Sequence, residues 1–342
     1  MITLTRDTRL TAWQSFLCGG VAGVLGRTVT SPLDVVKILS QVGTFHSKHG
    51  FLGTFRLLCK AEGLRALWKG NLTACMRLFP YSAVQLALYH RFTLLFVDDL
   101  GHISKWKAIV SGGVAGAVAA VVIYPTDVIK TRLIVQNSRE PSYRGIIHAL
   151  CSIYYQEGFL SLYKGVSLIV LGAIPFSASL FLIDLSLDRL WQESSVPLTP
   201  LQHFVNGCLA GGVAQTLSFP FETVKRKMQA QSCVLPHCGG VDVHFSGILD
   251  CFTQTVKIKG VLSLWNGLSA NLIKVIPYFG LMLGSFECCK RLCLYHNGYI
   301  VSPLGNQLTP GVDQSLQPHE LQELRKFLRS KEFVSRKPPL NG

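Results

Sequence analysis

The chain has 342 residues, of which 49% are hydrophobic and only 15% are charged. A soluble protein carries about 25% charged residues, so the composition favours a membrane protein over a soluble one. The formal net charge is +14, but no basic stripe interleaved with aromatic residues points to nucleic acid. We therefore expect anionic lipid and an anionic solute as partners, and no nucleic acid.

The first long apolar run, residues 13–41, contains the motif around which the chain is organised. It reads SPLDVVK at residues 31–37 and returns as YPTDVIK at residues 124–130 and FPFETVK at residues 219–225. Pro32, Pro125 and Pro220 stand 93 and 95 residues apart. A period this long exceeds a solenoid repeat and indicates a helical hairpin used three times.

Each copy of the motif places an acid and a lysine three residues apart, on one face of a membrane-spanning helix. These residues are Asp34, Lys37, Asp127, Lys130, Glu222 and Lys225. Charges at membrane depth cost free energy unless they face the interior and find partners. One copy alone reads as a proline-kinked helix end with a solvated charge pair. Three copies in register predict a ring of ion pairs that closes a gate.

A polar connection at residues 42–70 ends in EGLRALWKG, and the later copies end in EGFLSLYKG and KGVLSLWNG. We expect each connection to hold a short amphipathic helix at the membrane surface. The helix N-terminus that follows can bind a lipid phosphate. The expected lipid-binding positions are Trp68, Lys69, Gly70, Tyr163, Lys164, Gly165 and Gly267. Copy three has Lys259 in place of the acid and Asn266 in place of the base, so it fits a lipid site least well.

Further spans are expected at residues 72–96, 106–136, 167–191, 201–231 and 268–294, which makes six in all. The long connections carry most of the loop bases, so the positive-inside tendency puts them on the inner side and both termini on the other. The expected repeats are residues 10–101, 104–195 and 198–296. Residues 297–342 form a polar, flexible tail with one helix at residues 318–333.

The cysteines and the termini give few functional signals. Eleven scattered cysteines show no disulfide framework and indicate thiols in a reducing compartment. The segment CVLPHCGGVDVH has a conceivable metal spacing, but it reads better as a glycine-rich loop. No nucleophile–base pair, metal cluster or P-loop appears, so we expect neither an enzyme nor a cofactor. The N-terminus has no secretory or transit peptide, so any targeting signal is internal.

The triple motif, each copy followed by an acid–glycine and an aromatic–base–glycine, resembles the mitochondrial carrier family (solute carrier family 25) over about residues 10–296. The resemblance implies a six-helix barrel with threefold pseudosymmetry that works by alternating access in the mitochondrial inner membrane, here as a monomer. It also implies matrix-gate pairs of Asp34 with Lys130, Asp127 with Lys225, and Glu222 with Lys37. The family's bracing glutamine is matched by Gln41 and Gln229, but the second repeat has Ile134 there.

The resemblance also implies a cytoplasmic gate, but only the third repeat keeps its aromatic–acid–base pattern, with Glu287 and Lys290. His90 and Asp188 occupy positions that would pair with reversed signs, whereas Glu287 and Lys290 lose their partners. We predict a weak outer gate and a stronger inner one. Unequal gates would bias the resting state toward opening outward.

Symmetry places a candidate solute site three residues before each proline of the even-numbered spans, near the midplane where transporter sites lie. With the residues that follow them and one base on the first span, these positions are Arg27, Arg77, Gly172, Ala173, Lys274 and Val275. They coincide with the family's solute-contact points. Three cations imply an anionic solute. The alternative is that Arg77 or Lys274 pairs internally, with Asp184 available.

The strings RTVTSPLDVVK and AQTLSFPFETVKRKMQ look most like the family branch that carries adenine nucleotides and coenzyme A. Gly172 and Ala173 would then offer a flat apolar surface to a base. We expect a carrier that exchanges or imports a phosphorylated nucleotide-like or coenzyme A-like anion. The alternative is a carrier-fold scaffold or receptor without transport, which the degraded outer gate and the tail favour and the intact inner gate does not.

Overall fold

The computed structural model describes residues 9–43, 50–96, 105–137, 140–192, 200–238, 241, 243–303, 307–309, 314–315, 317–321 and 323. In these ranges the chain is helical, apart from one isolated antiparallel bridge between Ile300 and Leu308. The predicted spans correspond to α1 (Ala12–Val42), α3 (Asn71–Phe96), α4 (Lys105–Val122) with α5 (Tyr124–Val135), α7 (Ser167–Gln192), α8 (Pro200–Ala230) and α10 (Leu268–Asn297).

By length and composition alone, two helical segments of the described chain can cross a membrane, Phe159–Leu180 and Val261–Asn297. A third candidate is the bent pair of Ser111–Val122 and Tyr124–Val135. The other long helices are recognised as spans by their place in the repeat and not by mean hydropathy.

The motif proline acts differently in the three repeats. Pro32 and Pro220 lie inside the continuous helices α1 and α8. In the second repeat the helix breaks at Ile123, and the two halves meet at 55°. Pro125 then stands in the first turn of α5, where its missing N–H costs nothing and its fixed φ suits a helix start. The kink expected in every repeat is therefore a complete break in the second.

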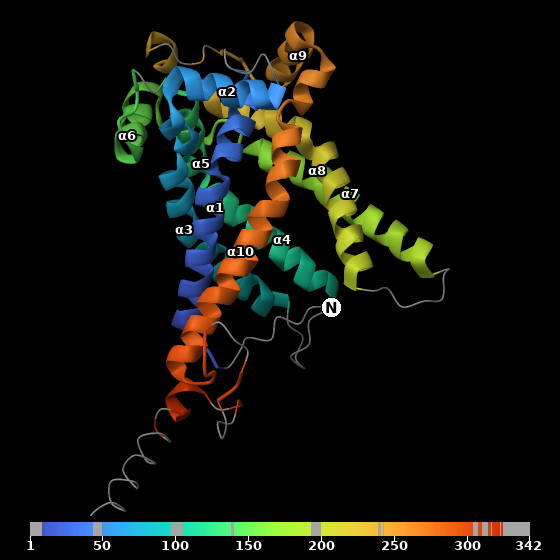
Figure 1. Cartoon of the computed structure of the whole chain (residues 1–342). Helices are drawn as coiled ribbons and strands as arrows, with labels where there is room; N and C mark the ends of the chain where they lie inside the picture. The colour runs from blue at the N-terminus through green and yellow to red at the C-terminus, as the bar shows by residue number, and fades with distance from the viewer. Residues whose placement is uncertain are drawn as a thin grey trace, which may run out of the picture. The chain divides into compact units, whose positions relative to one another are not determined.

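Each connection holds a surface helix: α2 (Gly50–Glu62), α6 (Ile146–Glu157) and α9 (Ile248–Lys259). Figure 1 shows these helices at one end of the bundle. The glycine after each one has a positive φ of 83°, 84° or 78°, at Gly63, Gly158 and Gly260. Only glycine adopts this conformation without strain, so the acid–glycine and lysine–glycine pairs mark where the surface helices stop.

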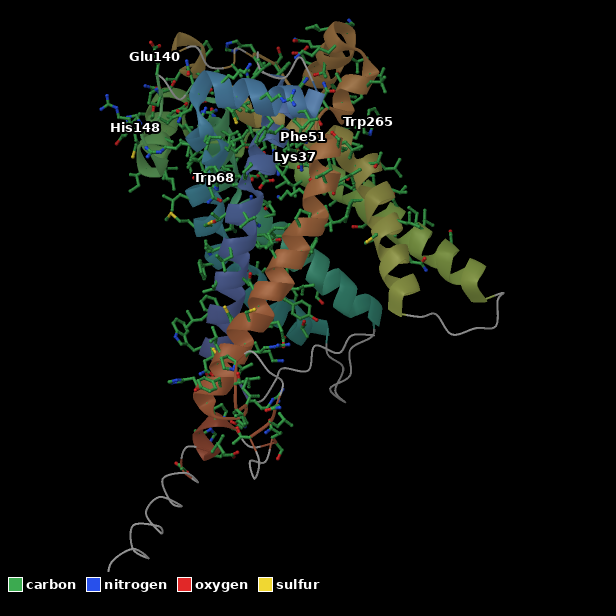
Figure 2. The ribbon with its side chains drawn as sticks, in the orientation of Figure 1. Lys37, Phe51, Trp68, Glu140, His148 and Trp265 are labelled. Atoms are coloured by element: carbon green, nitrogen blue, oxygen red, sulfur yellow. The ribbon has the colours of Figure 1, made fainter. Side chains whose placement is uncertain are left out.

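A short 3₁₀ turn then joins each surface helix to the next span: η2 (Leu64–Trp68), η3 (Phe159–Tyr163) and η5 (Val261–Trp265). The indole N–H of Trp68 donates to the carbonyl of Thr28 at 2.9 Å, and that of Trp265 donates to the carbonyl of Thr216 at 2.8 Å. Both tryptophans are labelled in Figure 2. Each thus ties a connection to the first spanning helix of its own repeat, α1 for Trp68 and α8 for Trp265.

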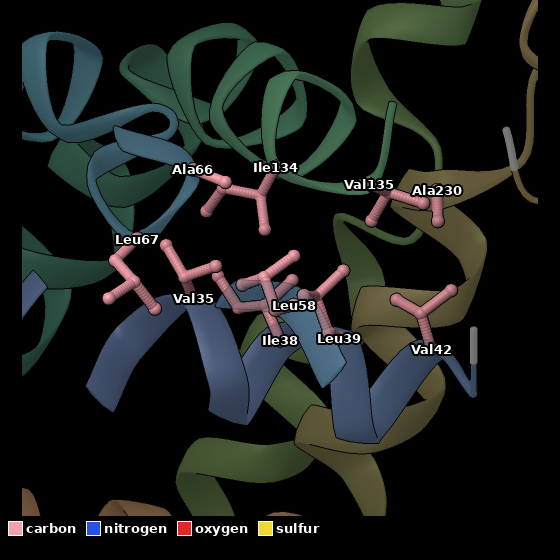
Figure 3. Packing of buried hydrophobic residues seen from close by; sticks show 10 residues of the cluster. All are labelled: Val35, Ile38, Leu39, Val42, Leu58, Ala66, Leu67, Ile134, Val135 and Ala230. Atoms are coloured by element: carbon pink, nitrogen blue, oxygen red, sulfur yellow. The ribbon is translucent and has the colours of Figure 1, made fainter. Parts of the chain in front are cut away.

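The apolar core beneath α2 joins all three repeats (Figure 3). Four of its residues come from one face of α1 and Leu58 comes from α2. The cluster is Val35, Ile38, Leu39, Val42, Leu58, Ala66, Leu67, Ile134, Val135 and Ala230. The spacing of the α1 residues is that of an amphipathic helix face, so the end of α1 that carries the motif is fixed by packing.

The chain divides into two compact units, one of Arg27–Pro277 and the other of Met1–Gly26 with Tyr278–Gly342. In the second, Tyr299, Ile300 and Leu321 pack with Leu10 and Leu294 in a buried cluster. The expectation of a wholly flexible tail is therefore wrong for these residues, because the tail carries apolar side chains that cover the ends of α1 and α10. Residues 318–321 and 323 are helical as predicted, and the remainder of the helix predicted to residue 333 lies outside the described residues.

Candidate functional site

All three matrix-gate pairs implied by the family resemblance are in contact. Lys37 Nζ lies 2.7 Å from a Glu222 carboxylate oxygen, Lys225 Nζ lies 2.9 Å from Asp127, and Lys130 Nζ lies 3.5 Å from Asp34. Each pair joins two different repeats. We call these six residues the matrix ring. Their role as a gate stays a prediction.

Two cations expected at the solute site also contact the matrix ring. Arg77 Nη1 lies 2.5 Å from Asp127 Oδ1, and Lys274 Nζ lies 2.6 Å from Asp34 Oδ1. The internal pairing weighed as an alternative therefore occurs, but with ring acids as the partners. The side chain of Asp184 lies outside the described residues. Arg77 links α3 to α5 and Lys274 links α10 to α1, so both add ties between repeats.

Two further residues contact the matrix ring and were not predicted from the sequence. Arg226 Nη1 lies 3.3 Å from Asp127 Oδ1 and donates to Thr131 at 2.9 Å. Asn271 accepts a hydrogen bond from Lys37 Nζ at 2.8 Å. The run of three bases at residues 225–227 was a visible signal for Arg226, whereas a lone asparagine in an apolar helix gave none for Asn271.

Charges in the ring do not balance. In the described part of the chain, three carboxylates form ion pairs with six cations. The carboxylates are those of Asp34, Asp127 and Glu222, and the cations are those of Lys37, Arg77, Lys130, Lys225, Arg226 and Lys274. Six cations less three anions leave three positive charges in excess. Such an excess in a low-dielectric site favours an anion with several charges.

The two bracing glutamines differ. Gln229 donates to Asp127 Oδ2 at 3.2 Å and accepts from Thr131 at 2.8 Å, so it is well placed to brace the ring. Gln41 is 1% exposed, and neither of its amide atoms has a hydrogen-bond partner among the described residues. The expectation that Gln41 braces the ring is therefore wrong for this conformation. Ile134 lies in the apolar core instead.

For the remaining expected solute-contact positions, the structure shows packing contacts or exposure to solvent. Gly172 faces α8, and a Cβ there would lie 3.2 Å from Phe221 Cβ, so this glycine serves helix packing. Ala173 and Val275 are exposed. Arg27 has contacts within the structure. A base-binding surface at Gly172 and Ala173 stays a prediction.

The cytoplasmic gate is only partly described. The side chains of His90 and Asp188 lie outside the described residues, so their pairing stays a prediction. Glu287 contacts Arg291, one turn along its own helix, at 3.3 Å. Lys290 also has contacts. Arg291 stands on α10 itself, so the expected loss of the gate partners of Glu287 and Lys290 on the other repeats stays a prediction.

Internal partners occupy the lysines expected to bind lipid. Lys69 pairs with Glu62 and donates to the carbonyl of Gln136 at 2.7 Å. Burial lowers the pKa of Lys69, although Glu62 acts in the opposite direction. Lys164 lies 3.8 Å from Glu157. Both lysines thus fasten the connections, and a lipid phosphate there would rely mainly on backbone N–H groups. Lipid binding at the expected positions stays a prediction.

The acid of the second connection is the centre of a buried network. Arg132 donates to both Glu157 oxygens, at 2.9 and 2.7 Å, and neither side chain is more than 1% exposed. Burial raises the pKa of Glu157, but the hydrogen bonds and charge of Arg132 outweigh it and hold that pKa below its ordinary value. The acid–glycine pair therefore supplies a structural anion as well as a turn.

The chain repeats one unit of two spanning helices and a surface helix three times, and it buries charges where the three repeats meet. This arrangement defines a transporter of the carrier type. The family model for mitochondrial carrier proteins matches residues 8–100, 101–195 and 196–297. The chain belongs to the mitochondrial carrier family. Its fold is therefore six transmembrane helices in three repeats, each with a short surface helix on the matrix side.

Among its relatives, the chain is 61% identical over 331 residues to solute carrier family 25 member 43 of Danio rerio, which covers 97% of this chain and 96% of that protein. It is 58% identical over 340 residues to the protein of that name in Mus musculus, covering 99% and 100%. It is 32% identical over 302 residues to the mitochondrial adenine nucleotide transporter ADNT1 of Arabidopsis thaliana, covering 81% and 86%. Carriers of this family are multi-pass proteins of the mitochondrial inner membrane.

Proposed function

We propose that this protein carries a phosphorylated, nucleotide-like or coenzyme A-like anion across the inner membrane by alternating access. The excess of three positive charges in and around the matrix ring is the observation that carries the proposal. A solute with several phosphate charges neutralises this excess, whereas a neutral or cationic solute does not. The similarity to an adenine nucleotide transporter supports the same class.

Arg77 and Lys274 connect solute binding to opening. Both occupy expected solute-contact positions, and both tie one repeat to another through a ring acid. An anionic solute that takes these two cations removes two ties between repeats at the closed end. Because a ligand shifts a conformational equilibrium only by its differential affinity for the two states, this exchange of partners gives the solute a way to favour opening.

Three features of the transport cycle complete the proposal. The protein works as a monomer, with both termini in the intermembrane space. Anionic lipid binds at the helix N-termini that follow Gly70, Gly165 and Gly267. Transport is an exchange of one anion for another.

Reconstitution of the purified full-length protein into liposomes tests the proposal. Vesicles loaded with a nucleotide are expected to take up labelled adenine nucleotides or coenzyme A, and not amino acids, at a rate above that of protein-free vesicles. Arg77→Ala is expected to lower the rate of uptake by about 10- to 100-fold. The proposal is contradicted if the protein folds normally but transports no phosphorylated solute. That result is expected of a scaffold or receptor.

A further inference from the structure

The third repeat differs from the other two in charge at the end of its surface helix. Glu62 and Glu157 end α2 and α6, and each pairs with a lysine beyond its 3₁₀ turn. In the third repeat Lys259 stands at the end of α9. A cation therefore occupies the position where the other repeats have a carboxylate.

The second repeat shows which donors surround that carboxylate. Glu157 accepts from both terminal nitrogens of Arg132, from Ser232 Oγ at 2.7 Å and from the backbone N–H of Cys233 at 3.2 Å. Arg132 stands seven residues after Pro125. The Glu157 carboxylate thus neutralises the charge of Arg132, which is buried near the C-terminal end of α5.

Lys227 occupies the place of Arg132 in the third repeat, seven residues after Pro220. It is 5% exposed and donates to Thr255 Oγ1 at 2.8 Å. Within the described residues it has no carboxylate partner, and Lys259, one turn beyond Thr255 on the same face of α9, adds a like charge to this region. An ammonium carries three donors, so one hydrogen bond to a hydroxyl leaves most of its requirement unmet.

Among the residues that the structure describes around α9, none supplies the missing charge. Burial raises the pKa of Cys251 on α9 to about 11, so this residue is a neutral thiol at physiological pH. Asp250, the adjacent acid, accepts hydrogen bonds from the backbone of Ser246 and the side chain of Gln254. Lys259 Nζ lies 3.4 Å from the carbonyl oxygen of Gly43, a neutral acceptor.

We propose that a phosphate-type anion binds between Lys227 and Lys259 and replaces the carboxylate of the other repeats. Two ammonium groups with neutral acceptors suit an anion with nearly two charges, and a phosphate monoester or inorganic phosphate carries about that at neutral pH. Thr255 holds Lys227 in place from α9, because its hydroxyl accepts from Lys227 Nζ at 2.8 Å and donates to the carbonyl of Cys251 at 2.7 Å. The site is distinct from the matrix ring, because neither lysine contacts a ring acid. The source of the anion is free phosphate or the headgroup of an anionic lipid.

Thermal unfolding of the purified, delipidated full-length protein tests this site. Inorganic phosphate in roughly tenfold excess over its Kd is expected to raise the Tm by about 3 °C over chloride of equal ionic strength. Lys227→Met is expected to lose this rise. Lys259→Glu supplies the missing carboxylate in the chain, so it is expected to have a higher Tm without phosphate and no further rise with it. Lys259→Gln is expected to lose most of the rise.

Two control variants separate this site from other anion sites. Lys257→Gln removes an exposed lysine from the same helix and is expected to keep the full rise. Arg65→Gln removes an exposed arginine of η2 and is expected to keep it as well. Because the readout is thermal unfolding and not uptake, failure of the proposed transport does not affect this test. A second arm replaces phosphate by micelles of anionic or neutral phospholipid.

The outcomes are then distinct. A rise with phosphate that Lys227→Met abolishes identifies a free anion, and a rise only with anionic lipid that the same variant abolishes identifies a headgroup. Both support the site. A rise that persists in Lys227→Met and Lys259→Glu, or no rise with either ligand, overturns it.

Discussion

Arg77 Nη1 lies 2.5 Å from Asp127 Oδ1, so a residue at an expected solute-contact position is bound to an acid of the matrix ring. Arg77 also lies over the ring of Tyr81 on its own helix, 5.8 Å from the centroid. In the proposed function, solute binding and closure of the ring therefore compete for the guanidinium of Arg77. Three predictions follow from this contact and from the other buried charges, and a fourth concerns a pair of neighbouring thiols.

Arg77→Ala is expected to lower the rate of nucleotide or coenzyme A uptake by about 10- to 100-fold, because a hydrogen bond to a charged group contributes about 1.5 to 3 kcal/mol. Arg77→Lys keeps the charge but not the fork geometry of the guanidinium, so its uptake rate is expected to lie between those of the native protein and Arg77→Ala. Uptake into liposomes measures the effect. Arg65→Ala, at an exposed position of η2, serves as the control and is expected to transport normally. Equal loss in both variants would show that the effect is not specific to the ring.

Exchanging the charges of one ring pair is expected to restore what a single reversal destroys. Lys37 Nζ lies 2.7 Å from Glu222, so Lys37→Glu places two carboxylates against each other and should lower both the Tm and the transport rate. Lys37→Glu combined with Glu222→Lys should recover much of the Tm. A double variant as unstable as the sum of its parts would mean that the two residues do not act on each other.

Glu157→Gln is expected to lower stability by about 3 to 5 kcal/mol, because it leaves the buried charge of Arg132 without its partner. The effect depends on pH. The pKa of Glu157 is lower in the folded protein than its ordinary value of 4.5. Its contribution is therefore complete above that value and is lost as pH falls through the folded pKa. Unfolding followed as the pH is lowered from above 4.5 to below the folded pKa of Glu157 should show a steeper decline for the native protein than for the variant.

Oxidation is expected to link α1 to α10. Cys18 Sγ and Cys293 Sγ lie 3.7 Å apart within one compact unit, and both are free thiols. Hydrogen peroxide takes the two hydrogens as water and leaves a disulfide once the sulfurs approach to about 2.05 Å. Peptide mapping after treatment should detect the Cys18–Cys293 peptide, and Cys18→Ser should lack it. Cys208, an exposed thiol of α8, is expected to remain unlinked, and a link to Cys208 instead would contradict the packing.

The parts of the site that were predictable from sequence are those that repeat. Three copies of one motif were enough to place six charges on facing helices, because membrane burial forces such charges to meet. Glycine after each surface helix was predictable for the same reason.

Residues that occur once were much harder to predict. Asn271, which binds Lys37, has no counterpart in the other repeats. The pairing of Lys274 with Asp34 depends on how α10 approaches α1, which no local pattern records. The position of Gln41 fitted a brace, yet its hydrogen bonds depend on how closely the neighbouring helices approach.

The break at Ile123 divides the odd-numbered helix of the second repeat into two rigid rods, whereas α1 and α8 run unbroken past their prolines. Because α4 and α5 are already separated at Ile123, α5 can rotate relative to α4 through a few backbone dihedrals. A continuous helix must first break backbone hydrogen bonds before it can bend in this way. Motion of the three thirds is thus expected to be sequential, with the second leading, and labels placed on either side of Ile123 would report the earliest change in distance.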